Sequence, residues 1–396
     1  MADAPTSAPG RFAWLALVAG EASGDLLAAQ LLHGLRQRWA GLRAAGIGGP
    51  ALVAQGLEAW WPSDKLAVRG YVEVLRHYRE IVGIRRRLRA RLLAQRPALF
   101  LGVDAPDFNL ALEADLRAAG IPTAHFVAPA IWAWRPERVE LIRRACDHVL
   151  CLFPFEPALL AEHGVPATYV GHPLAAVIPE QPDQAGARQQ WGLPADARVV
   201  ALLPGSRRAE IDHLLPRFLA AADRMRREQP SLHFVLPAVP ALQALIRAQV
   251  AASPVAACVR VLPGASHAAL AACDVALVAS GTATLEAALF KRPMVIAYHM
   301  HRLSWLITRR KMRQPWVGLP NILCGEWVVP ELLQDDATPA ALAQATLAWL
   351  DEGPGAQARR VALQQRFARL HAELKRDTVA LAAQALQPLW QRGGGA

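Results

Sequence analysis

The 396-residue sequence contains little cysteine, and no cysteines and histidines have the spacing of a zinc site. Its five cysteines are odd in number, form no CxxC pair and lie in apolar surroundings. This usage argues against a disulfide framework. It predicts buried free thiols in a reducing compartment.

Long hydrophobic runs are absent as well. No uncharged apolar stretch reaches the length of about 18 residues that a membrane-spanning helix needs. The N-terminus carries an acid and no basic segment before the apolar run 12–19, which is unlike a secretory signal peptide. We therefore expect a cytoplasmic protein whose contact with a membrane is peripheral.

Two nucleotide-binding fingerprints are missing. Residues 46–49 do not complete a GxGxxG pattern, and the loop at 203–208 lacks the GxxxxGK[ST] spacing of a P-loop. A dinucleotide cofactor and P-loop chemistry are therefore disfavoured. No helix-turn-helix, zinc-finger or RNA-recognition signature accompanies the basic segments, so we predict no nucleic-acid partner.

The composition is that of a folded, basic protein. Hydrophobic residues make up 53% and charged residues 19%, which excludes a disordered chain. The 43 Lys and Arg residues exceed the 33 Asp and Glu residues, giving a formal charge of +10. Such a surface attracts anions, which include phosphates and acidic lipid headgroups.

Short apolar runs alternate with helical segments along most of the chain, which predicts βαβ units and parallel sheets in an α/β fold. A change in composition near 178–197 predicts domains at 1–178 and 179–350, which would face each other across a cleft. Helices at 351–396 would cap the second domain or cross back to the first. Strands are expected at 12–19, 98–103, 123–127, 148–152, 168–170, 199–203, 233–236, 259–262, 275–279 and 294–297.

The segment 275–289 is the most informative motif. A strand ends at Ser280, Gly281 and Thr282, where a helix begins. Free N–H groups and the helix dipole make such a start an anion site, and Glu286, one turn farther, could accept the ribose hydroxyls of a nucleotide. An ordinary Ser/Thr helix cap gives the same local pattern and stays an alternative.

A second loop of small residues follows the strand 199–203. It contains Gly205 and Ser206 and ends at Arg207, whose guanidinium could clamp phosphate oxygens and stabilise a departing diphosphate. A solvated basic loop is the alternative for this segment.

Two acidic loops occur in the first half of the chain. Glu21 and Asp25 lie in the turn after the first strand, and Asp104 and Asp107 follow the strand 98–103. Transfer to a hydroxyl needs a general base, and such loops are where one would lie. Helix capping is as good an interpretation of Asp107, whereas Asp104 directly follows its strand and is the better candidate.

Residues 66–91 combine an apolar stripe with an arginine cluster, and residues 301–311 form a second basic, aromatic segment. An interfacial helix on anionic lipid and a core helix with a basic solvent face both fit the first segment. The same two interpretations apply to the second.

Taken together, eight motifs resemble those of the bacterial lipid-A-disaccharide synthase family. They follow the family's order from about residue 12 to about residue 325, and their combination is specific although each alone is modest. The motifs are Val18–Asp25, Gly102–Asn109, Pro129–Arg135, Leu152–Glu156, Gly171–Pro173, Leu203–Arg207, Ala279–Glu286 and Leu319–Asn321.

The resemblance implies a GT-B glycosyltransferase fold of two Rossmann-like domains, with UDP held mainly by the second. It implies an inverting transfer from UDP-2,3-diacylglucosamine to 2,3-diacylglucosamine 1-phosphate, without metal or cofactor, at the inner face of the inner membrane. A homodimer and a monomer are both compatible with it. Functional positions of the family correspond to Glu21, Asp104, Arg207 and Asn321, with the segment 280–286 around the nucleotide, Asp104 as the candidate base and Asn321 orienting donor or phosphate. Ser23, Gly205 and Ser206 are further candidates for binding the substrate or UDP.

Two other interpretations compete with this one. A UDP-sugar epimerase or a peptidoglycan glycosyltransferase would keep the fold and change the chemistry. A non-catalytic membrane- or nucleic-acid-binding protein would explain the charge but not the segments 203–207 and 280–286.

Overall fold

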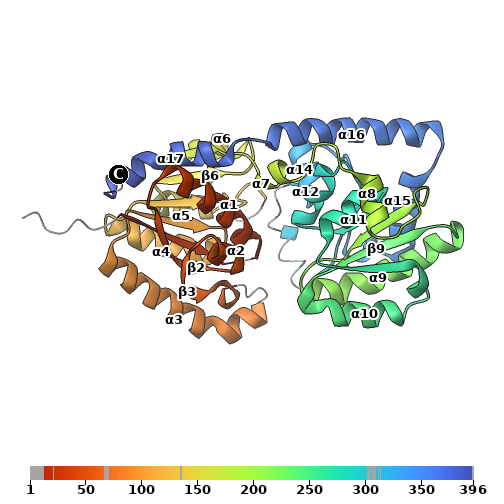
Figure 1. Ribbon diagram of the computed structural model, residues 1–396, viewed down its shortest axis with the longest axis horizontal. Helices are drawn as coiled ribbons and strands as arrows, with labels where there is room; N and C mark the ends of the chain where they lie inside the picture. The colour runs from red at the N-terminus through yellow and green to blue at the C-terminus, as the bar shows by residue number, and fades with distance from the viewer. Residues whose placement is uncertain are drawn as a thin grey trace, which may run out of the picture. The chain divides into compact units, whose positions relative to one another are not determined.

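The computed structural model describes residues 13–20, 22–66, 71–133, 136–300, 305, 309–310, 312 and 314–394. The chain forms two compact units, Met1–Pro173 with Arg376–Ala396, and Leu174–Lys375 (Figure 1). Each unit contains one parallel sheet with helices on it, which confirms the predicted α/β class.

The sheet of the N-terminal unit has the order β3-β2-β1-β4-β5-β6-β7, with every pair parallel. The chain runs outward from β1 to β2 and β3, then returns to the other side of β1 with β4. The strand order therefore reverses between β1 and β4, the position where α/β sheets bind ligands. The strands are β1 (Trp14–Ala19), β2 (Arg43–Gly48), β3 (Glu58–Pro62), β4 (Leu99–Val103), β5 (Thr123–Phe126), β6 (His148–Cys151) and β7 (Ala167–Tyr169).

One helix of this unit comes from the far end of the chain. Helix α17 packs on α1, where the rings of Trp39 and Trp390 stack at 4.8 Å and the Trp39 indole N–H donates to Gln387. The helices of this part are α1 (Ala22–Arg38), α2 (Pro50–Ala54), α3 (Tyr71–Gln95), α4 (Pro106–Ala118), α5 (Arg138–Ala145), α6 (Glu156–Ala161) and α17 (Thr378–Arg392), with α7 (Pro173–Val177) at the boundary between the units.

The C-terminal unit repeats this topology with the order β10-β9-β8-β11-β12-β13, so its strand order reverses between β8 and β11. Its strands are β8 (Val199–Leu203), β9 (His233–Ala238), β10 (Val259–Pro263), β11 (Val275–Ala279), β12 (Met294–Tyr298) and β13 (Glu331–Leu333). Its helices are α8 (Gln184–Gln190), α9 (Arg208–Glu228), α10 (Gln243–Ala251), α11 (Ser266–Ala272), α12 (Thr282–Leu289), α14 (Leu319–Cys324), α15 (Pro339–Leu350) and α16 (Pro354–Leu374).

The central strands of both sheets are the apolar runs that the sequence predicts, and β8 and β11 are buried along their whole length. Strands β2, β3 and β13 were not predicted. Strand β2 has the sequence Arg-Ala-Ala-Gly-Ile-Gly, which contains two glycines and only one β-branched residue, and β13 has only three residues. Pairing with β1 and β12, rather than local propensity, makes these segments strands.

No helix in the described part of the chain combines the length and the apolar character that crossing a bilayer requires.

Candidate functional site

The two acidic loops of the N-terminal unit lie against each other where its strand order reverses. A Cβ atom on Gly20 would lie 2.9 Å from the Cβ of Ala105, and one on Gly24 would lie 3.6 Å from the Cβ of Asp104. Glycine at position 20 therefore lets the turn after β1 approach the turn after β4, whereas the distance at Gly24 is an ordinary contact. The sheet therefore brings Asp104 beside the first turn of α1.

Asp104 lies in a strained turn. Its φ is 50° and that of Ala105 is 44°, a left-handed conformation that disfavours residues with a Cβ by about 1–2 kcal/mol each. The buried Asn109 side chain holds this turn, because its amide nitrogen donates to the Asp104 carbonyl at 2.8 Å. Among the described residues, no hydrogen bond or ion pair engages the Asp104 carboxylate. Strain of this kind collects at functional sites.

The other acids of these loops have structural partners. The buried Asp25 carboxylate accepts the backbone N–H groups of Gly49 at 2.7 Å and of Ala51 at 2.9 Å, and so caps α2. Asp107 is exposed and forms an ion pair with Arg138. Ser23 is exposed in the first turn of α1, and Glu21 lies outside the described residues. Asp104 is therefore the described acid best suited to accept a proton.

The C-terminal unit presents a helix start where its strand order reverses. Gly281 has a φ of 148° and a ψ of −163°, which residues with a Cβ rarely adopt, and open space lies where its Cβ would be. Gly281 and Thr282 are exposed, and Ser280 donates its hydroxyl to the Val317 carbonyl at 3.1 Å. The N–H groups at the start of α12 are thus presented to an incoming anion.

Glu286 lies one turn along α12 and is mostly buried, with its side chain 17% exposed. Its carboxylate lies 3.7 Å from the imidazole of His267, a residue of α11 that sequence reasoning missed. The His267 ring packs against Phe290 at 5.4 Å.

In the loop after β8, backbone N–H groups donate to the carboxylate of Glu210. Glu210 accepts the N–H groups of Ser206 at 3.0 Å and of Arg207 at 3.2 Å, and pairs with the Arg207 guanidinium at 2.8 Å. Gly205 has a φ of 112° and a Cβ there would clash with Glu210. The loop therefore already binds one anionic group, supplied by its own helix α9.

Asn321 is fully buried, and its side chain is saturated with hydrogen bonds. Its amide nitrogen donates to Val329 at 2.9 Å and to Glu331 at 2.8 Å, and its oxygen accepts the N–H groups of Val328 and Val329. Burial raises the pKa of Glu331, whose oxygens also accept the N–H groups of Val317 and Gly318.

Glu331 thus links Asn321 to Val317, whose carbonyl in turn binds Ser280. Sequence reasoning missed Glu331, because only the fold brings it to the loop. Asn321 is placed to act on the α12 start through this chain of hydrogen bonds.

Three of the shared motifs meet in an aromatic cluster of the N-terminal unit. The rings of Phe153 and Phe155 stack at 6.1 Å, and Trp132 meets Phe155 edge-on at 5.4 Å. Burial raises the pKa of Glu156 to about 7, although it accepts the Phe153 N–H and the Trp132 indole N–H. Burial lowers the pKa of His172, beside Phe153, to about 4. In this cluster Phe153, Glu156 and His172 are buried, and Trp132 and Phe155 are half-buried.

The part of the arginine-rich helix α3 whose side chains are described packs one face on the core. Ile84, Leu88 and Leu92 are buried, and Arg91 lies over the Trp60 ring at 3.7 Å. From Ile84 onward, the interpretation as a core helix with a basic solvent face therefore holds. The side chains of residues 71–78 and most of the second basic segment, 301–311, lie outside the described structure.

Comparison with known sequences identifies the family. The profile of the family described as lipid-A-disaccharide synthetase matches residues 15–386. A lipid-A-disaccharide synthase of Albidiferax ferrireducens is 62% identical over 378 residues, which cover 95% of this chain and 97% of that protein. One of Cupriavidus pinatubonensis is 53% identical over 382 residues, covering 96% and 94%.

Solved structures agree on the fold. The kitacinnamycin glycosyltransferase has a TM-score of 0.61 at 19% identity and covers 96% of this chain and 100% of that chain. The UDP-GlcNAc 2-epimerase of Neisseria meningitidis has a TM-score of 0.65 at 11% identity, covering 95% and 100%. At these identities the likeness shows the fold alone, and it confirms the predicted GT-B architecture of two Rossmann-like domains. With the sequence relatives, it shows that this chain belongs to the lipid-A-disaccharide synthase family and is a glycosyltransferase of lipid A synthesis.

Proposed function

We propose that the chain transfers 2,3-diacylglucosamine from its UDP conjugate to 2,3-diacylglucosamine 1-phosphate. The products are a β-1,6-linked disaccharide 1-phosphate and UDP, and the anomeric configuration is inverted. The observation that carries the proposal is that each unit has a suitable chemical group where its strand order reverses. One unit has the Asp104 carboxylate, which has no hydrogen bond or ion pair with the described residues, and the other has an open helix start.

Asp104 is the proposed general base. Its carboxylate would take the proton of the acceptor's 6-hydroxyl as that oxygen bonds to the anomeric carbon of the donor, while the bond to UDP breaks. Asp25 and Asp107 are engaged elsewhere, which supports this choice. Ser23, on the neighbouring turn, and Glu21 are proposed to contact the substrate or assist the base.

The C-terminal unit is proposed to hold UDP. The N–H groups at Gly281 and Thr282 would bind the diphosphate, and Glu286 would accept the ribose hydroxyls. Arg207, with the Gly205–Ser206 backbone, would neutralise the charge that grows on departing UDP. The diphosphate would compete with Glu210 for these donors, since that carboxylate uses them now.

Asn321 is proposed to position the donor site from within the protein. Its four hydrogen bonds hold the loop whose Val317 carbonyl fixes Ser280. This differs from direct contact with the donor, which a fully buried and saturated amide is poorly placed to make.

The acylated substrates imply work at a membrane surface, and the positive charge of the chain suits an anionic leaflet. We place the enzyme at the inner face of the inner membrane on this argument. Because the apolar stripe of α3 is buried from Ile84 onward, contact with lipid by the described part of this helix would fall to its exposed arginines.

The test is an assay of purified protein in detergent with both substrates, following UDP release and disaccharide formation together. Appearance of both products in equal amounts is expected. UDP release without disaccharide, from folded protein, would contradict the assigned acceptor. Folded protein that UDP does not stabilise against heat would contradict the assignment of a UDP site.

A further inference from the structure

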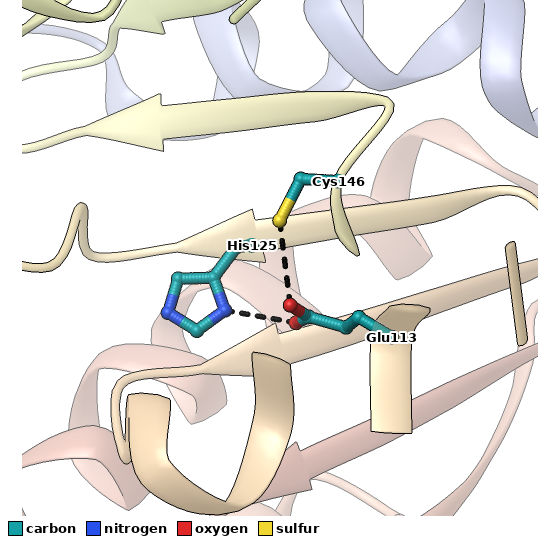
Figure 2. A group of neighbouring side chains, drawn as sticks. All are labelled: Glu113, His125 and Cys146. Carbon is teal, nitrogen blue, oxygen red and sulfur yellow. Dashed lines mark hydrogen bonds and ion pairs between the residues drawn. The ribbon is translucent and has the colours of Figure 1, made fainter. Parts of the chain in front are cut away.

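A buried cluster of three reactive side chains lies next to the Asp104 turn, on residues that no motif argument singled out as functional. His125 Nδ1 lies 2.8 Å from one oxygen of Glu113, and the thiol of Cys146 donates to the other at 3.3 Å (Figure 2). They come from β5, from α4 and from the residue after α5, and all three are at most 1% exposed. Such a group needs an explanation, because burying ionisable side chains is costly.

The sheet makes room for this cluster. Gly102 of β4 lies beside His125 in the register of the two strands, and a Cβ at Gly102 would clash with a Glu113 oxygen. Burial lowers the pKa of His125, but the attraction and hydrogen bond of Glu113 and the attraction of Asp104 outweigh it, and the pKa is raised overall. The imidazolium is therefore favoured, with Glu113 and Asp104 as the acids whose charges act on it.

Asn109 connects the cluster to the turn. It lies one helical turn before Glu113 on α4, flanks the same glycine, and donates to the Asp104 carbonyl. Two buried atoms of the described structure have no hydrogen-bond partner here, namely His125 Nε2 and Asn109 Oδ1. In Figure 2 the second ring nitrogen of His125 lies on the side away from Glu113. An imidazolium N–H is a donor and an amide oxygen is an acceptor, so the two unpaired groups are complementary.

We propose that the Glu113–His125 pair is a positioning element for Asp104: it places the His125 ring near the strained turn and, with Asn109 beside the same glycine, holds that turn so that the Asp104 carboxylate is aimed at the acceptor. The inference rests on the proposed function, in which Asp104 takes the acceptor's proton. Cys146 completes the hydrogen bonding of Glu113. Burial and the neighbouring Glu113 raise the pKa of its thiol well above the usual range, which favours a proton-bearing partner over a metal ligand.

The first test compares His125→Gln and Glu113→Gln with the wild type in the disaccharide assay from pH 5 to pH 9. Both variants should lose at least tenfold in kcat at neutral pH, and the acidic limb of the kcat profile should move to higher pH. The KM for the UDP-sugar should change less than twofold. Thr123→Val is the matched control, since Thr123 lies on the same strand face and donates to Ala145 at 2.7 Å. It should lower the melting temperature and leave the acidic limb in place.

The second test does not depend on turnover. The ring of His125, assigned by its loss in His125→Gln, is titrated by NMR in the wild type and in Asp104→Asn. Its titration midpoint should fall in Asp104→Asn, because an attracting charge is gone. An unmoved midpoint, or an unmoved acidic limb in both cluster variants, would overturn the proposal. So would stoichiometric zinc in the purified protein that disappears in Cys146→Ala. If the His125 titration midpoint falls in Asp104→Asn but the wild type makes no disaccharide, the proposed function is contradicted. The electrostatic coupling of the Glu113–His125 pair to Asp104 would still be supported.

Discussion

The two units share a topology, but the loops at the points where their strand orders reverse differ in residue type and backbone conformation. In the loops that follow β1 and β4, the described residues with positive φ are Asp104 and Ala105, held in a strained turn by Asn109. In the loops that follow β8 and β11 they are Gly205 and Gly281, where the conformation carries little strain. A carboxylate must be aimed, and a rigid strained turn can aim it. In the proposed reaction a diphosphate needs open backbone N–H groups, which the exposed turn at Gly281 offers, whereas the N–H groups after Gly205 now bind Glu210.

The largest effect should follow from Asp104→Asn. Asparagine tolerates the left-handed conformation, so the turn should keep its shape while the base is lost. We expect kcat to fall by about 10²–10⁴-fold, the usual contribution of a general base. Turnover under saturating substrates measures it, with Asp107→Asn as the matched control. Near-normal turnover in Asp104→Asn would remove Asp104 from the role of base.

Arg207→Met should act on the donor side. Removing one charge-assisted contact of about 1.5–3 kcal/mol predicts a loss of roughly 10- to 150-fold in kcat/KM for the UDP-sugar. Arg208→Met serves as control, because Arg208 pairs with Asp212 on the exposed face of α9 and should change kcat/KM less than about twofold. Equal losses in the two variants would show that net charge, rather than the position of Arg207, is responsible.

Gly281→Ala tests whether the open N–H groups at the start of α12 bind UDP. A methyl group there would strain the turn and cover the helix start, so UDP should bind about tenfold more weakly. Gly264→Ala introduces a Cβ at another residue of the same unit with positive φ, here 59°. It should reduce stability without changing UDP affinity, as measured by calorimetry. Unchanged affinity in Gly281→Ala would argue against a diphosphate at this helix.

The smallest expected effect concerns stability alone. The pKa of Glu156 is raised from 4.5 to about 7, so its contribution is present below pH 4.5 and is lost as the pH rises to 7. Relative to Glu156→Gln, the wild type should lose up to about 3 kcal/mol of unfolding free energy across this window. Urea unfolding of both proteins at pH 4.5 and pH 7.5 measures the difference. An equal difference in unfolding free energy between the two proteins at both pH values would show that Glu156 is not protonated on burial. Turnover per folded molecule should not change with this difference in stability.

The sequence predicts those parts of the molecule in which the signal is local. Apolar runs that end in small or acidic residues locate β8, β11, Asp104 and Ser280, because a parallel strand and its loop are continuous in the chain. Strand β2 could not be predicted in this way, because pairing with β1 rather than its local sequence makes it a strand.

The residues that hold the site groups in place, such as Glu331 and His125, could not be predicted from the sequence either, because their contacts are tertiary. Glu331 reaches Asn321 and Val317 only through the pairing of β13 with β12, and His125 meets Glu113 only because β5 lies beside β4. Helix α17 packs on the N-terminal unit, where Trp390 stacks on Trp39, a residue from the opposite end of the chain. Chemical groups at strand ends are thus visible in the sequence, whereas the residues that hold them depend on tertiary contacts.

The division of labour between the units is tested most directly by the affinity for UDP, measured by calorimetry on the wild type, Asp104→Asn and Arg207→Met. We predict that Asp104→Asn binds UDP as the wild type does and that Arg207→Met binds it at least about tenfold more weakly. A large loss of UDP affinity in Asp104→Asn, with wild-type affinity in Arg207→Met, would contradict the assignment of base and donor sites to the two units.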